Sequence, residues 1–228
     1  VALIGALGVL FYQNFIEKKD ASNTVATSSS SAGSQSPSGT TVSLKEFTSN
    51  KNLIQFFYPT SWSVKETIFT DQADWYSSAI VIKDTEGKLV AELGTGGQFG
   101  GACDQDSPYA NATTLENESA SVKGVQDAHY GATIIANEDG TYEVYYGLNN
   151  GELMVGTQKV QCPEMAVGYK YIVKANNSAI GSVTFGSWNA DSSEKLGTFS
   201  SYDAAKAYLS SDEMKQVKVM IASLTIGG

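Results

Sequence analysis

Residues 52–186 consist of short apolar segments separated by turn-forming sequences, and this pattern limits the fold more than any other feature of the chain. Asp139-Gly140 and Asn150-Gly151 are the clearest turns, because tight hairpin turns require residues that adopt positive φ. Strands joined by short turns pair antiparallel. The sequence therefore predicts a mainly antiparallel sheet, in which Asn150-Gly151 leads one strand into the next. The expected strands cover residues 52–59, 62–69, 79–82, 89–93, 129–136, 141–148, 153–160, 169–173 and 180–185.

Alternation of side chains along these strands assigns residues to faces. In the strand at 141–148, Tyr142, Val144 and Tyr146 are expected on one face and Tyr145 on the other. Core packing explains most of these aromatic side chains, and an exposed aromatic face for a protein or glycan partner is the alternative. Three side chains near the strand at 62–69 are expected to point inward: Trp62, Val64 and Ile68.

In the last thirty residues, the spacing of the apolar side chains changes from every second residue, as in strands, to about every 3.6 residues, as in helices. A short helix is expected over Asp203 to Leu209, and Ser210 to Glu213 has the capping-box pattern of a second helix start. The second helix carries apolar residues at the spacing of one helical face, which favours packing against the sheet. These apolar residues are Met214, Val217, Ile221 and Leu224. The fold class expected for residues 43–228 is therefore α+β, with a mainly antiparallel sheet flanked by C-terminal helices.

The N-terminus has a different character. Residues 1–16 are apolar and uncharged, so residues 1–20 are expected to form a hydrophobic anchor helix of the transmembrane type. Sixteen helical residues span about 24 Å, so we expect residues preceding Val1 to complete a bilayer span. Residues 21–42 are serine-rich and have no apolar period, which is typical of a flexible linker. The side chains expected in a membrane or in a filament core are Val1, Leu3, Ile4, Leu7, Val9, Leu10, Phe11 and Phe15.

The charged composition excludes several classes of site. The chain has a net charge of −9, with 15 lysines, no arginine and one histidine, His129. This balance argues against nucleic acid as a partner, because phosphates favour clustered basic residues. Two cysteines and one histidine cannot make a four-ligand zinc site without carboxylates. The glycines of residues 94–101 are followed by neither a lysine nor a helix signal, which excludes a phosphate-binding loop. No catalytic constellation is evident, so we expect a non-enzymatic protein without a cofactor, in which His129 is a capped or surface residue.

Two features of the central part suggest further sites. Cys103 and Cys162 are expected to form a disulfide outside the cytoplasm, closing a loop of about 60 residues and adding roughly 4 kcal/mol of stability. Two buried free thiols are the alternative. Asp104 and Asp106 are expected in one long loop together with Glu116 and Glu118. Carboxylates so close in sequence are solvated by default, and calcium is the cation they would hold.

Both ends of the body resemble PsbP/Mog1-like domains. Phe56-Phe57-Tyr58-Pro59-Thr60-Ser61-Trp62-Ser63-Val64 is similar to the opening of these domains, in which an aromatic strand ends at proline and tryptophan begins the next strand. The helical close, from Tyr202 through Met220-Ile221-Ala222-Ser223-Leu224-Thr225-Ile226, is similar to theirs as well. The resemblance covers residues 44–226 and implies an antiparallel sheet flanked by helices, with binding or assembly roles. It assigns no functional residue.

These features lead to one main expectation about function and one alternative. An apolar run, a linker and a folded body are the arrangement of a single-pass anchored protein. We therefore expect a membrane-anchored, extracytoplasmic binding or assembly domain at the cell surface, with an unknown protein or glycan partner. The alternative is a structural subunit of a pilin-like surface filament, in which copies of residues 1–16 bundle in the core.

Overall fold

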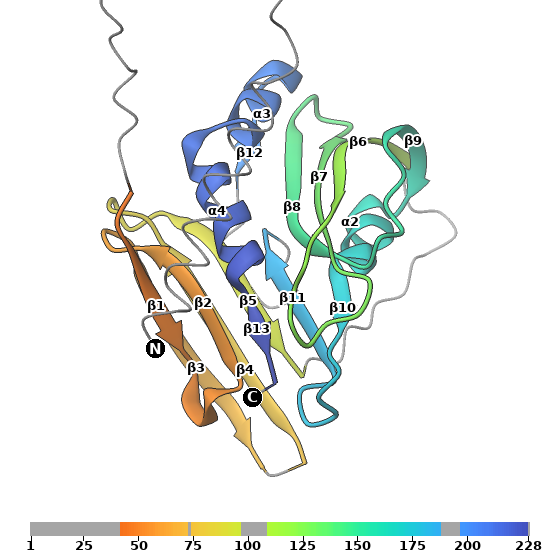
Figure 1. Cartoon of the computed structure of the whole chain (residues 1–228). Helices are drawn as coiled ribbons and strands as arrows, with labels where there is room; N and C mark the ends of the chain where they lie inside the picture. Colours follow the sequence, from red (N-terminus) through yellow and green to blue (C-terminus); the bar gives the residue numbers. More distant parts are fainter. Residues whose placement is uncertain (1–41, 73, 97–108, 188–196, 228) are drawn as a thin grey trace, which may run out of the picture. The chain divides into compact units, whose positions relative to one another are not determined.

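The computed structural model describes residues 42–227 except 73, 97–108 and 188–196 (Figure 1). The residues from Leu44 onward form one compact unit of antiparallel strands with a few short helices towards its C-terminus. This confirms the predicted α+β class for the body. The expected anchor helix at residues 1–20 and nearly all of the linker at 21–42 lie outside the described residues.

The larger of two sheets has eight strands in one path, ordered β3-β4-β5-β11-β8-β7-β6-β9, and every neighbouring pair is antiparallel. β10 pairs beside this path with β11, and β12 pairs with β8. The strands are β3 (Ser63–Asp71), β4 (Tyr76–Lys83), β5 (Leu89–Thr95), β6 (Tyr109–Ser119), β7 (His129–Ala136), β8 (Tyr142–Asn149), β9 (Gly156–Gln161), β10 (Ile172–Lys174), β11 (Ser182–Gly186) and β12 (Thr198–Phe199).

A second layer covers one face of this sheet. It contains the smaller sheet, ordered β1-β2-β13, and helices α3 and α4, which lie beside it (Figure 1). Helix α2 and the turn η2 lie against β6, β9 and β8 instead. The remaining elements are β1 (Leu44–Thr48), η1 (Asn50–Asn52), β2 (Ile54–Pro59), α2 (Pro163–Gly168), η2 (Tyr169–Tyr171), α3 (Tyr202–Leu209), α4 (Asp212–Ser223) and β13 (Thr225–Ile226).

The hydrophobic core is divided between the two faces of the larger sheet. The main core joins Ile80, Phe185 and Tyr146 to Phe56 of the smaller sheet and to the apolar face of α4. Each fully buried large apolar side chain contributes about 1.5–3 kcal/mol. A second, smaller cluster lies on the opposite face, where Tyr145 packs with other side chains under α2 and η2. Its buried members are Ala112, Ile135, Tyr145, Leu153, Val167 and Tyr171.

One contact between two glycines joins the two halves of the larger sheet. β11 and β8 are paired at a single position, Gly186 opposite Gly147, and both residues have positive φ, 146° and 136°. A Cβ on Gly147 would lie 2.0 Å from the carbonyl oxygen of Phe185, and one on Gly186 would lie 1.9 Å from that of Tyr146. Only glycine permits this approach. Ser187 reinforces it, because its N–H donates to the Tyr146 oxygen at 2.8 Å and its Oγ accepts from the Tyr146 N–H at 2.7 Å.

Much of the predicted strand and helix pattern is confirmed. The hairpins β4–β5, β7–β8 and β10–β11 form with the expected partners. Tyr146 and Tyr145 lie in the main and second cores respectively, as the alternation predicted. Met214 and the other apolar residues of the second helix are buried. Ser211 caps that helix by accepting from the Met214 N–H, but Glu213 contacts Tyr208 instead of completing a capping box.

Three expectations are wrong. The last part of the supposed long loop at 94–117 is strand β6, which begins at Tyr109 and pairs with both β7 and β9. β9 begins at Gly156, not at Leu153, and pairs with β6 instead of β8, because the Asn150-Gly151 turn carries the chain away from the β7–β8 hairpin. Ile68 is 39% exposed, because β3 lies at the sheet edge and its register shifts after this residue.

The glycine contact predicts a large effect from a single methyl group. We expect Gly147→Ala to lower the free energy of unfolding by more than about 4 kcal/mol, because the added Cβ meets fixed backbone. Gly140→Ala is the matched control, since Gly140 also has positive φ but nothing lies within 4 Å of its Cβ position. Its loss should be about 1–2 kcal/mol. Urea unfolding of both variants checks this, and equal losses would contradict it.

Candidate functional site

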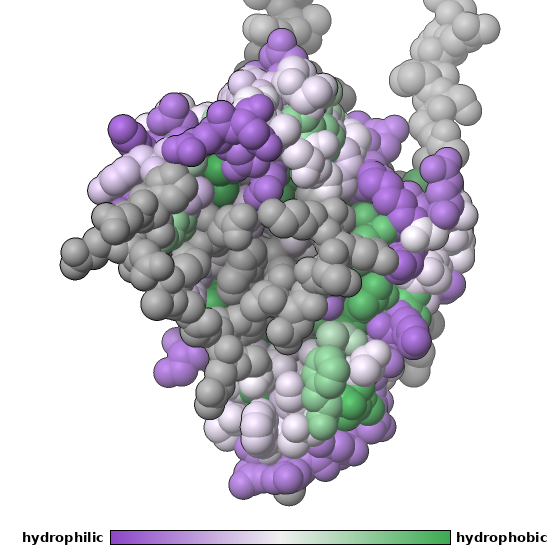
Figure 2. Space-filling model, turned by 180° about the vertical axis from the view of Figure 1, so that it is seen from behind, coloured by the Kyte–Doolittle hydropathy of each residue, from purple (hydrophilic) through white to green (hydrophobic). Residues whose placement is uncertain are grey.

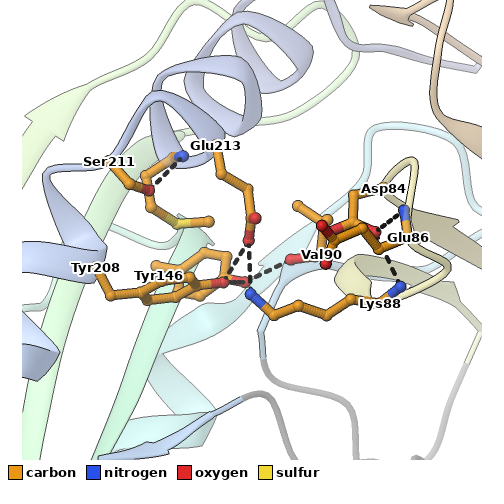
Figure 3. Close-up of polar contacts among 9 residues, drawn as sticks. Asp84, Glu86, Lys88, Val90, Tyr146, Tyr208, Ser211 and Glu213 are labelled. Atoms are coloured by element: carbon orange, nitrogen blue, oxygen red, sulfur yellow. Dashed lines mark hydrogen bonds and ion pairs between the residues drawn. The ribbon is translucent and has the colours of Figure 1, made fainter.

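A polar cluster joins the helices to the β4–β5 hairpin (Figure 3). Tyr208 of α3 donates its hydroxyl proton to Glu213 Oε1 of α4 at 2.7 Å, and Lys88 Nζ lies 3.4 Å from the same oxygen. Tyr146 donates to the carbonyl oxygen of Val90. The two tyrosine hydroxyl oxygens are 3.2 Å apart, and Lys88 Nζ lies 4.8 Å from the centroid of the Tyr208 ring.

The chemistry of this cluster is structural. Burial raises the pKa of Tyr146 and Tyr208 well above 10.0, so both hydroxyls stay protonated at neutral pH. Each hydroxyl carries one proton, and that proton is held by Val90 or by Glu213. A tyrosine with its proton so engaged is a poor nucleophile or base. The arrangement therefore fixes α3 and α4 against the sheet.

A second cluster corrects the expected loop of acidic residues. Glu116 and Glu118 lie on β6, where Lys218 of α4 forms ion pairs with both carboxylates. Lys218 Nζ also lies 4.5 Å from the centroid of the Tyr130 ring. The two glutamates are thus paired with a cation and are not loop ligands for calcium. Within the described residues, no group of three or more potential ligand side chains could hold a metal ion.

Polar atoms also gather beneath the Asn150-Gly151 turn. Asn117 Nδ2 donates to the carbonyl oxygens of Gly151 and Leu153, and Asn149 Oδ1 accepts from the Gly151 N–H. These bonds hold the turn on the second core. His129 lies against Gly151, and its buried Nδ1 has no hydrogen-bond partner among the described residues. A small hollow with a volume of about 20 Å³ opens nearby between β9 and α2, which is enough space for a water molecule.

The two outer strands of the larger sheet, β3 and β9, are its edges. Within the described residues, β3 pairs only with β4 and β9 only with β6, so each leaves one row of backbone groups without a strand partner. We define the β3 edge as β3 with Ile68, Phe69 and Trp75, and the β9 edge as β9 with Met154 and Val155. Both edges expose large apolar side chains, with Phe69 63% and Val155 66% exposed.

The register shift in β3 explains the exposure at its edge. Ile68 is opposite Ser78, but Thr70 is opposite Ser77, so Phe69 is an extra residue that turns outward. Trp75 follows in the turn to β4 and is 48% exposed. Figure 2 shows apolar side chains gathered over this side of the molecule, above a hydrophilic end. Singly exposed apolar residues are common, whereas a group of them on an edge strand makes that edge a candidate contact surface.

Several predicted site residues lie outside the described residues. These are Cys103, Asp104, Asp106 and the apolar residues of 1–16. Cys162 follows β9 directly, and its bridge to Cys103 stays a prediction. Among the helices that the structure describes, none is long and apolar enough to span a membrane.

Sequence reasoning missed both edges. The only signal at the β3 edge was the adjacent pair Ile68-Phe69, which breaks the alternation expected of a strand. The β9 edge has no separate signal in the sequence, because Leu153 to Val160 has the composition of one continuous strand that includes Met154 and Val155. Neither pattern shows which strands end a sheet.

No family model, curated protein or solved structure matches this chain. The resemblance to PsbP/Mog1-like domains therefore stays a prediction.

Buried tyrosines predict how the chain responds to alkali. Among the described residues the pKa is raised for five tyrosines, chiefly by burial, and the pKa of Tyr76 is raised to about 12. Above pH 10 the unfolded chain loses these protons before the folded chain does, so the free energy of unfolding falls as pH rises from about 10 towards 12. We expect the tyrosinate absorbance of these residues to appear together with loss of near-ultraviolet circular dichroism. Full ionisation of all tyrosines in the folded chain would contradict this. The five are Tyr76, Tyr130, Tyr146, Tyr171 and Tyr208.

The predicted disulfide can be tested directly. We expect mass spectrometry of a digest of the native chain, made without reduction, to find one cross-linked peptide containing Cys103 and Cys162. Reduction should separate it into two peptides. Two thiols that react with an alkylating agent in the unreduced native chain would contradict the prediction.

Proposed function

We propose that this protein is a membrane-anchored, extracytoplasmic binding or assembly domain without enzymatic activity. The observation that carries the proposal is the pair of edges at opposite ends of the larger sheet, each with exposed apolar side chains. The apolar residues 1–16 and the serine-rich linker support the location. The polar clusters of the body hold its elements together, which favours a rigid scaffold with binding surfaces over a catalytic site.

β1 and β3 place the exposed residues of the β3 edge at the opposite end of the body from its first residue, Leu44. The linker joins the body at Leu44, which is opposite Pro59, and Pro59 lies at the turn into β3. β3 then runs for nine residues away from this end, about 26 Å at 3.3 Å per residue. Lys51, beyond the far end of β1, contacts Asp71 at the far end of β3. Phe69 is therefore far from Leu44, the residue at which the body begins.

The resemblance to PsbP/Mog1-like domains belongs to this proposal. β2 ends at Pro59 and β3 begins directly after Trp62, in agreement with the pattern quoted for the opening of those domains. At the other end, α4 is followed by the short strand β13. An assembly role is what that resemblance implies.

A filament subunit is the second candidate, and one observation favours it. The path through the larger sheet has eight strands with all neighbours antiparallel, so β9 runs opposite to β3. A second copy added at either edge would therefore continue the antiparallel pattern. Electron microscopy of negatively stained cell-surface preparations, with and without the gene, tests this candidate.

Cell fractionation tests the main proposal. We expect the full chain in the membrane fraction, accessible to protease added outside intact spheroplasts. A chain without residues 1–20 should move to the soluble fraction, because only the apolar run anchors it. Full-length protein found wholly in the cytosolic fraction would contradict the proposal.

A further inference from the structure

We propose that the β3 edge of one copy of this chain pairs with the β9 edge of the next, so that the larger sheet continues from copy to copy. The inference rests on the assembly role proposed above and names the partner as a second copy. It follows from the direction, the faces, the charges and the apolar residues of the two edges.

The strand directions permit continuation without a change of pattern. β3 and β9 run in opposite directions within one copy, because seven antiparallel pairings separate them. A second copy placed beside β9 in the same orientation presents its own β3, which runs opposite to β9. The junction is then an ordinary antiparallel pair with its backbone groups satisfied. Such a contact uses two different surfaces, so it does not close after two copies.

The faces of the two edge strands also match. Glu66 is opposite Ile80, which belongs to the main core, so Glu66 lies on the core face of the sheet. Thr157 is opposite Thr113, which is opposite Ile134 of the same core, so Thr157 and by alternation Lys159 lie on that face too. In a continued sheet, Lys159 of one copy and Glu66 of the next stand on the same side.

One register brings the complementary groups together. With Lys159 opposite Glu66, antiparallel pairing puts Thr157 opposite Ile68 and Gly156 opposite Phe69. Four residue pairs then form before the irregular position at Phe69, between residues 65–68 and 157–160. An opposite-charge pair and adjoining apolar side chains in the same register each stabilise a strand pair.

The same register places the most exposed apolar residues of both edges side by side. Val155 precedes Gly156 and would stand opposite Thr70, next to Phe69. These two side chains are 66% and 63% exposed in the single chain. Burying apolar surface of this kind is the main favourable term in association.

Sedimentation velocity of the full chain in detergent solution tests the proposal. We expect the wild-type chain to form a concentration-dependent series of species. Phe69→Ser on the β3 edge and Lys159→Glu on the β9 edge should each weaken self-association by about tenfold or more, because a central contact is lost or a like-charge pair is created. Val42→Ser, an exposed position that belongs to neither edge, is the control and should associate like the wild type.

Mixing the two variants gives the decisive result. A Phe69→Ser copy keeps its β9 edge and a Lys159→Glu copy keeps its β3 edge, so a one-to-one mixture should form a dimer and nothing larger. A mixture that stays monomeric, or variants that associate like the wild type, would overturn the proposal. Circular dichroism and urea midpoints must match the wild type, and Val155→Ser replaces Lys159→Glu if that variant does not fold.

This result is separate from the location of the protein. A chain found at the membrane whose variants associate normally would overturn the pairing alone. A chain found in the cytosol would contradict the anchored location, while the sedimentation of the mixture would still decide whether the edges pair.

Discussion

The close approach of Gly147 and Gly186 is the constraint on which the rest of the fold depends. It is the only pairing between β8 and β11 in the described residues, and it connects β3-β4-β5-β11 to β8-β7-β6-β9. Because neither glycine has a Cβ, the two backbones come close together. Ser187 can then form hydrogen bonds with both the N–H and the carbonyl oxygen of Tyr146. Tyr146 then extends across the main core to Val90. One side chain thus joins both halves of the sheet.

The surfaces available for function follow from this arrangement. The main core and the helices cover the middle of the sheet, and the cluster of Tyr208, Glu213 and Lys88 fixes the helices to it. An open sheet built this way has two outer strands. In this chain, these strands and the residues next to them expose large apolar side chains. A rigid sheet holds the two edges at fixed positions, which is what repeated assembly requires.

Local signals in the sequence predicted part of this fold well. Turn chemistry at Asp139-Gly140 located the β7–β8 hairpin, and alternation separated Tyr145 from Tyr146. Pairings between distant segments could not be predicted, because the period of a strand identifies its faces but not its neighbours. The sequence therefore predicts neither the strand at Tyr109–Ser119 nor its pairing with β9. The candidate site depends on which strands are outermost, so it was missed for the same reason.

Native-state hydrogen exchange of the backbone amides at Tyr146 and Ser187 tests the central claim most directly. If the glycine contact makes the two halves of the sheet one cooperative unit, both amides exchange only through global unfolding, with the same free energy as the amides of β5 and β7. If the halves are independent, these amides exchange through a smaller opening, and β5 and β7 give different free energies. That result would contradict the account.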